Sequence, residues 1–305
     1  MTTALAISDR EALGLRDQLL TEGYTVVPQV FEQPNLALFS QWTARYFERH
    51  GNDPRFRYQG SDIKVYSPAY WAMGTVRRNI LDLKDPHTHL NRRIPDALAT
   101  RFVSEPRLRH ACAAIGLESI TSDQGMVTIL SKPAHGPPLY WHQAFMDWDH
   151  PSAVTPWPTR VFLGTYLTDT SKENGCLRVI PGTHRQRIDL HDLLLDAHEE
   201  SVREATLESV AFAERNDAVN LPMQAGDLVV CDARTLHAAH ANKSGKRRTM
   251  LLAWHDVFPF PSPPVGGPAQ FPTLSVKPDP SCSPNVSNNA VQVPTWNNTV
   301  SPHLG

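Results

Sequence analysis

The stretch GCLRVIPGTH, residues 175–184, is one of several short β-rich runs that succeed one another between about residue 123 and residue 257. The other runs are MVTILSKP (126–133), PLYWHQAFMDW (138–148), TRVFLGTYLTD (159–169), DLVVCDARTLHAAH (227–240) and RRTMLLAWHDVF (247–258). Turn residues separate each run from the next. Several short strands at regular spacing favour a β-sandwich or a β-barrel.

A helix and a strand are expected close to the start of the chain. SDREALGLRDQLLTE (8–22) has Ser8 as its cap and Glu11 as the capping-box partner three residues on. Gly23 ends this helix, and YTVVPQVF (24–31) follows as a strand.

Further helices are expected ahead of the β-rich runs and within them. QPNLALFSQWTARYFERH (33–50) has apolar residues near a helical period, which predicts a second amphipathic helix. A helical stretch is expected around 93–116 and helical insertions at 188–214, while 51–90 is expected to be irregular. The predicted class is therefore mainly β with flanking helices.

Composition is that of an ordinary globular protein. The 305 residues are 41 % hydrophobic and 20 % charged, with a formal net charge of −2 and no long block of either sign. A nucleic acid or an anionic membrane is therefore not expected as the main partner. The four cysteines are far apart and form no CxxC pair, so they indicate neither a disulfide framework nor a zinc ribbon and favour a reducing cytoplasm. No apolar stretch is long enough to span a bilayer.

The chain is expected to form one domain and a tail. The domain covers 1–257, with a helical part at 1–120 and a β core at about 123–257. Residues 258–305 are rich in Pro, Ser and Asn, so they are expected to form an extended tail or a wrapping arm. The expected partner is a small-molecule substrate, and the sequence carries no signal for an oligomeric state.

Two histidines in separate β-rich runs indicate a metal site. Residues i and i+2 of a strand point to the same face, so His142 and residue 144 are expected to address one point in space. His237 lies in another run. Two histidines with an acid at i+2 would form the 2-His-1-carboxylate triad of non-haem Fe(II), which leaves coordination positions open for a co-substrate and dioxygen.

A basic residue follows the second histidine at the start of an apolar run. Arg248 lies eleven residues beyond His237. Its fork-shaped guanidinium can hold a carboxylate through two hydrogen bonds. This suits the distal carboxylate of 2-oxoglutarate, whose other end chelates iron.

With these residues in this order, the chain resembles the phytanoyl-CoA dioxygenase family of Fe(II)/2-oxoglutarate oxygenases. The matching segments run in the family's order from about residue 22 to 257. They are GYTVVPQVF, KP followed by YWHQ, ENGCLRVIPGTHR, GDLVVCDARTLHAAH and the pair Arg247–Arg248. The resemblance implies a double-stranded β-helix core, a jelly-roll or cupin-like barrel with helices on one side.

The resemblance also implies the site. His142 and His237 match the family's iron ligands, and Arg248 matches the clamp on the 2-oxoglutarate carboxylate. Thr128, on the strand before the first ligand, is a candidate for another contact to the co-substrate. The activity implied is oxidation of a small molecule by dioxygen, with Fe(II) and 2-oxoglutarate as cofactors.

Ala144 departs from the family's usual His-x-Asp run, because the chain reads His142-Gln143-Ala144. Alanine has no lone pair to donate to a metal. Among relatives, a small residue at this position marks the non-haem iron halogenases, in which chloride takes the vacated coordination position. The resemblance therefore implies a halogenase-like enzyme that chlorinates an aliphatic carbon.

Three alternatives stay open at this stage. A hydroxylase whose iron-ligand Asp has been replaced at position 144 would have the same sequence. Asp147 or Asp149 could supply the carboxylate, although Asp147 would need a β-bulge to reach the face of His142. Finally, a binding protein could keep the fold without turnover.

Overall fold

A computed structural model describes residues 5–50, 57–58, 61–66, 98, 101–118, 126–143, 155–194 and 207–257 of the chain. The chain divides into the units Met1–Pro261 and Ser262–Gly305, and every described residue lies in the first. The predicted tail, 258–305, is outside the described residues. Among the helices in the described ranges, none is both long enough and apolar enough to cross a membrane.

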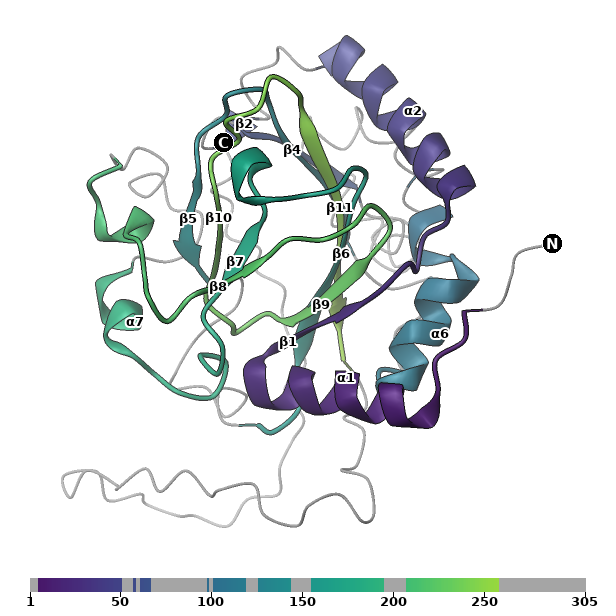
Figure 1. The fold of residues 1–305 in the computed structure, drawn as a ribbon, viewed down its shortest axis with the longest axis vertical. Helices are drawn as coiled ribbons and strands as arrows, with labels where there is room; N and C mark the ends of the chain where they lie inside the picture. The colour runs from purple at the N-terminus through teal and green to yellow at the C-terminus, as the bar shows by residue number, and fades with distance from the viewer. Residues whose placement is uncertain are drawn as a thin grey trace, which may run out of the picture. The chain divides into compact units, whose positions relative to one another are not determined.

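The larger of two antiparallel sheets has seven strands in the order β1-β9-β6-β11-β4-β3-β2 (Figure 1). These strands are β1 (Tyr24–Val27), β2 (Arg57–Tyr58), β3 (Ser61–Tyr66), β4 (Met126–Lys132), β6 (Arg160–Tyr166), β9 (Leu228–Asp232) and β11 (Arg248–Asp256). The long central strand β11 pairs with β6 on one side and with β4 on the other.

The smaller sheet has four strands in the order β5-β10-β7-β8, also antiparallel. They are β5 (Leu139–His142), β7 (Leu177–Val179), β8 (Val219–Leu221) and β10 (His237–Ala239). Three short helical pieces precede two of these strands in the chain, namely η3 (Lys172–Asn174) before β7, and α7 (Asp189–Leu193) and η4 (Val210–Phe212) before β8.

The first helix confirms its sequence signals. α1 (Asp9–Glu22) is capped by Ser8, whose side chain accepts from the Glu11 amide while Glu11 bonds back to Ser8. Gly23 ends the helix in the left-handed conformation with φ of 86°, which a residue without a Cβ adopts at little cost. The chain then enters β1 directly, which positions α1 along the edge of the large sheet.

The flanking helices cover one face of the large sheet. Figure 1 shows α1, α2 (Gln33–His50) and α6 (Pro106–Ala114) together on the same side of it. Their buried side chains form one apolar cluster with alternate residues of the sheet, including Ile129, Leu163, Val230, Leu251 and Ala253. Because alternate residues of a strand point to opposite faces, the intervening residues face the smaller sheet.

A second apolar cluster fills the space between the two sheets, which we call the inner space. It contains Phe162 and Tyr166 of β6, Leu177 and Val179 of β7, and Met250 of β11. Two antiparallel sheets closed over such a core, with helices outside, form the double-stranded β-helix that the sequence predicted.

Three features of the strands were not foreseen. The run DLVVCDARTLHAAH forms two strands in different sheets, β9 and β10, because the chain turns between them. β3 lies within the region expected to be irregular, and β8 lies just after the expected helical insertion. Both are short edge or near-edge strands that owe their conformation to pairing with a neighbour.

Candidate functional site

His142 and His237 lie opposite one another in neighbouring strands of the small sheet. β5 and β10 pair in a register that makes these two residues Cα partners. Their ring centroids are 4.2 Å apart, and the residues are only 6 % and 5 % exposed. The fold therefore brings together the two histidines that the sequence singled out.

Each of these imidazoles is oriented by a hydrogen bond to a backbone carbonyl. Nδ1 of His142 is 2.9 Å from the carbonyl oxygen of Tyr140, and Nδ1 of His237 is 2.8 Å from that of Thr235. A carbonyl only accepts, so both Nδ1 atoms carry the hydrogen. In a neutral ring this assigns the lone pair to Nε2, the arrangement in which metal-binding histidines are held.

The position of a third ligand is outside the described residues. β5 ends at His142, and Ala144, Asp147 and Asp149 all fall in the undescribed range 144–154. In the parts of the chain that the structure describes, no group of three or more His, Cys, Asp or Glu side chains could hold a metal ion. The described site is thus a pair of histidines, and the same-face argument for residue 144 stays a prediction.

Arg248 is a buried cation at the start of β11. It is 6 % exposed, and its guanidinium lies over the ring of Tyr166, 5.0 Å from the centroid. Its Nε is buried without a hydrogen-bond partner, and no ion pair joins it to a carboxylate among the described residues. Arg247, by contrast, is exposed and lies over Phe47. The register thus directs Arg248 inward and its neighbour outward.

A second buried cation lies beside Arg248. Lys132 is the Cα partner of Arg248 across β4 and β11, and it is 1 % exposed. Its Nζ donates to the carbonyl oxygens of Pro137 and His240, each at 2.7 Å. Burial, together with the charge of Arg248, lowers the pKa of Lys132 well below its ordinary value. A bound anion would offset the charge of Arg248.

The histidine pair and the buried guanidinium face the same inner space from two ends of β6. The ring of Phe162 is 5.0 Å from that of His237, while Tyr166 lies under Arg248. Four residues of extended strand separate the Cα atoms of Phe162 and Tyr166 by about 13 Å. The inner space can therefore offer nitrogen ligands at one end and a carboxylate-binding fork at the other.

Thr128 lies in β4, where its Cα partners are Leu252 of β11 and Val65 of β3. This strand borders the one that carries Arg248. The backbone position is compatible with a co-substrate contact, and that role stays a prediction.

Sequence reasoning missed a polar cluster that supports the two histidines. Arg234 is fully buried and forms a two-point ion pair with Asp232, through Nε at 2.9 Å and Nη2 at 2.6 Å. The side chain of Gln143 donates to the carbonyl oxygen of Arg234. The residue after His142 is thereby tied to the turn that delivers His237 from one sheet to the other. The pattern Asp-Ala-Arg offers no signal for this, since the partners are distant in sequence.

The comparisons with known proteins agree with this fold. The sequence profile of the phytanoyl-CoA dioxygenase (PhyH) family matches residues 19–250, and the chain belongs to this family. It is accordingly an enzyme of the Fe(II)/2-oxoglutarate-dependent oxygenase superfamily.

Individual relatives are distant. Ectoine dioxygenase of Bordetella bronchiseptica is 26 % identical over 176 residues, 55 % of this chain and 56 % of the relative. Ectoine dioxygenase of Stutzerimonas stutzeri is 24 % identical over 252 residues, 79 % of this chain and 75 % of the relative. L-proline trans-4-hydroxylase of Streptomyces griseoviridis is 31 % identical over 151 residues, 45 % and 56 % of the two chains. The chain thus spans little more than half the length of the first of these relatives.

Solved structures share the fold. EctD from S. alaskensis, crystallised with 2-oxoglutarate and 5-hydroxyectoine, has a TM-score of 0.51 at 18 % identity and covers 84 % of this chain and 78 % of its own. The carbocyclase SnoK from nogalamycin biosynthesis has a TM-score of 0.50 at 18 % identity, covering 84 % and 86 %. At this identity the likeness concerns the double-stranded β-helix alone.

Proposed function

We propose that the chain halogenates an unactivated aliphatic carbon of a small molecule, with chloride as the halide and Fe(II), 2-oxoglutarate and dioxygen as cofactors. One combination of observations supports this. His142 and His237 face each other with their Nδ1 atoms hydrogen-bonded to backbone carbonyls, and Arg248 offers a buried fork without a described carboxylate partner. Yet position 144, where the family's usual run has an acid, is alanine.

The described residues fit an iron ion and a dicarboxylate. His142 and His237 would hold the metal through Nε2, and Arg248 would hold the distal carboxylate of 2-oxoglutarate by charge-assisted hydrogen bonds. Thr128 would contribute a further polar contact to the co-substrate. When bound, the iron supplies the oxidising power that removes a hydrogen atom from an aliphatic carbon.

Charge balance explains why a halide suits this site. Two neutral imidazoles leave the charge of Fe(II) uncompensated by protein, and Ala144 leaves room where a carboxylate would bind. A chloride ion there restores one negative charge. The overall reaction balances as R–H + Cl⁻ + 2-oxoglutarate + O₂ + H⁺ giving R–Cl + succinate + CO₂ + H₂O.

The remaining inner residues orient the reactants and exclude water. The ring of Phe162 lies against His237 and the ring of Tyr166 lies under Arg248, and both are buried. They limit the positions that the co-substrate can take between the two charged ends. The tie from Gln143 to the carbonyl oxygen of Arg234 holds the strand end next to the open position.

Hydroxylation is the second candidate, and the relatives favour it. Several of them are named as dioxygenases or hydroxylases, including those that act on ectoine and L-proline. In this reading, Ala144 replaces the acid of a hydroxylase, and turnover is weak until the acid is restored. Ectoine and L-proline are the first substrates to test in either case.

The deciding experiment is anaerobic reconstitution with Fe(II) and 2-oxoglutarate, in buffer with and without chloride. The proposal expects chloride to change the absorption spectrum of the iron–2-oxoglutarate complex. After air is admitted with ectoine or L-proline, the product is expected to gain the mass and isotope pattern of one chlorine. An unchanged spectrum and a product with added oxygen in saturating chloride would rule out halogenation.

Two variants of position 144 separate the candidates. Ala144→Asp is expected to abolish the effect of chloride and to direct the reaction to hydroxylation, while Ala144→Gly, the matched control without a carboxylate, is expected to behave as the parent chain. If Ala144→Asp binds iron no better than the parent, residue 144 does not lie beside the metal. Absence of succinate under all these conditions would favour a binding protein, which the retained pair His142 and His237 and the unpaired Arg248 argue against.

A further inference from the structure

A separate cavity lies on the outer face of the small sheet. Arg178 alternates along β7 with Leu177 and Val179, which belong to the inner cluster, so its side chain lies on the opposite face. Ala238, its Cα partner on β10, likewise alternates with His237. The sheet therefore separates this cavity from the histidine pair.

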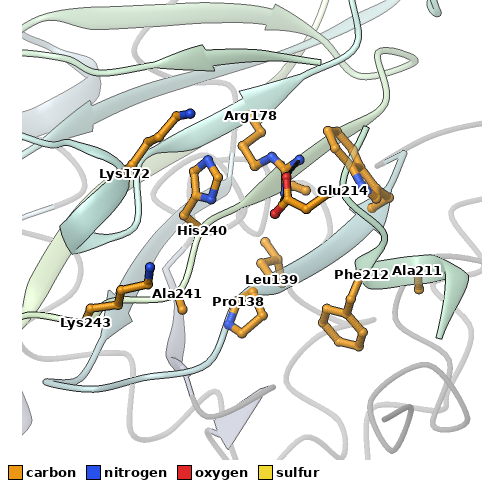
Figure 2. Close-up of a pocket in the computed structure, with 12 residues that line it drawn as sticks. Pro138, Leu139, Lys172, Arg178, Ala211, Phe212, Glu214, His240, Ala241 and Lys243 are labelled. Carbon is orange, nitrogen blue, oxygen red and sulfur yellow. Dashed lines mark hydrogen bonds and ion pairs between the residues drawn. The ribbon is translucent and has the colours of Figure 1, made fainter. Parts of the chain in front are cut away.

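The cavity has a volume of about 170 Å³ and a strongly basic lining (Figure 2). Lys172, Arg178, His240 and Lys243 contribute to its wall, against one acid, Glu214. Figure 2 shows His240 lying between Lys172 and Arg178, with Glu214 next to the Arg178 guanidinium. Such an excess of cationic groups around a small cavity attracts anions.

Arg178 gives the cavity its preorganised donor. It is 6 % exposed, and its guanidinium lies over the indole of Trp141, 4.9 Å from the ring centroid. Stacking on Trp141 fixes the plane of the fork. The Nε atom is buried and has no hydrogen-bond partner among the described residues. Leaving a buried donor unsatisfied costs roughly 1–3 kcal/mol, so this atom indicates a missing acceptor.

The one acid in the described lining, Glu214, already binds the Arg178 guanidinium through its carboxylate. The Glu214 carboxylate contacts Nη1 of Arg178 at 3.2 Å and Nη2 at 2.7 Å. The Glu214 side chain is 79 % exposed, whereas that of Arg178 is 7 % exposed. An exposed partner contributes little net energy to an ion pair, so a ligand that brings its own oxygens can displace it.

His240 adds an adaptable group to the same wall. Its Nε2 is hydrogen-bonded to the side-chain oxygen of Asn220. Burial, followed by the charge of Arg178, lowers the pKa of His240, while Glu214 opposes this effect. The ring therefore lies close to the Arg178 cation, and the only acid in the described lining that offsets this charge is the exposed Glu214.

We propose that this cavity is a second ligand site, distinct from the iron site, and that it binds a small oxyanion of the carboxylate or phosphate class. The ligand takes the place of the Glu214 carboxylate on Arg178 and accepts from Nε as well. The exposed Lys172 and Lys243 add positive charge to the lining. The small volume restricts the ligand to about the size of a short carboxylic acid or inorganic phosphate.

The test is calorimetric titration of the full chain with succinate, acetate and inorganic phosphate. Glu214→Gln removes the competing carboxylate without removing the fork, so it is expected to tighten binding by about 5- to 20-fold, which corresponds to about 1–2 kcal/mol. Glu173→Gln changes the net charge equally at an exposed residue outside the lining, and it is expected to leave the affinity within twofold. Arg178→Met is expected to abolish binding.

Several results would overturn the proposal. Equal affinity of the parent, Glu214→Gln and Arg178→Met chains would exclude this cavity as the site. Loss of all anion binding in Arg248→Met, with binding intact in Arg178→Met, would assign the ligand to the inner space instead. A gain in Glu214→Gln cannot arise from misfolding, so the test holds even if Arg178→Met is unstable. The relative affinities for succinate, acetate and phosphate identify the natural class of ligand.

Discussion

Replacement of Arg248 by methionine is expected to raise the stability of the ligand-free chain while removing its affinity for 2-oxoglutarate. Arg248 is buried, its Nε has no hydrogen-bond partner in the described parts of the chain, and the buried Lys132 is its Cα partner across the sheet. The folded protein therefore keeps two cations out of water without a described carboxylate beside Arg248. Methionine fills a similar volume without the charge.

The magnitudes follow from the two roles of this guanidinium. Exchanging an uncompensated buried charge for an apolar side chain is expected to stabilise the ligand-free chain by about 1–3 kcal/mol. At about 2–4 °C per kcal/mol for a chain of this size, the melting temperature should rise by about 2–12 °C. Two charge-assisted hydrogen bonds to the co-substrate are worth about 3–4 kcal/mol, so its dissociation constant should rise by about 100- to 1,000-fold.

The assay is thermal unfolding of the parent and variant chains, each with and without Fe(II) and 2-oxoglutarate under anaerobic conditions. The melting temperature of the parent should rise when the co-substrate is added. The ligand-free Arg248→Met chain should melt at a higher temperature than the parent, and the co-substrate should not raise it further. Arg247→Met is the matched control, because Arg247 is the exposed neighbour, and it should keep the co-substrate effect. A variant at position 248 that melts lower and still responds to 2-oxoglutarate would refute the reasoning.

Two further predictions concern stability. Gly226 has φ of 92°, and a Cβ there would lie 2.2 Å from the backbone oxygen of Phe31. Gly226→Ala should therefore lower the free energy of unfolding by more than about 2 kcal/mol in urea titrations. Gly245 has open space around it, so the control Gly245→Ala should change the free energy of unfolding by less than about 1 kcal/mol. Burial lowers the pKa of His184, whose Nε2–H donates to the carbonyl oxygen of Leu20 and whose buried Nδ1 has no hydrogen-bond partner within the described ranges. The unfolded chain then binds the extra proton more readily, so the contribution of His184 is complete above about pH 6.5 and is lost as the pH falls below that value. Urea titrations at about pH 7.5 and about pH 5.5 should show a lower free energy of unfolding at the lower pH in the parent, and a smaller decrease in His184→Gln. An equal decrease in the two chains would contradict this prediction.

Much of the fold follows from local patterns. The capping residues Ser8 and Glu11 with Gly23 delimit α1 because they satisfy the exposed backbone groups at its ends, whatever lies around them. The apolar runs that became β4, β6 and β11 are strands because alternate residues serve two cores at once. Short strands with weak patterns, such as β3 and β8, depend on a neighbour for their hydrogen bonds, so the sequence alone did not indicate them.

Some features of the candidate site also follow from the sequence, and others follow only from the tertiary structure. The sequence by itself determined the residue types: two histidines, a downstream arginine and an alanine where an acid is usual. Only the tertiary structure decided that His142 and His237 meet as Cα partners, because their register depends on strand pairing across distant segments. It also decided that Arg248, and not Arg247, points inward, because Arg248 begins β11 and lies over Tyr166, whereas Arg247 precedes the strand and lies over Phe47. The buried tie through Asp232, Arg234 and Gln143 likewise exists only in three dimensions, because residues that are remote in sequence form it.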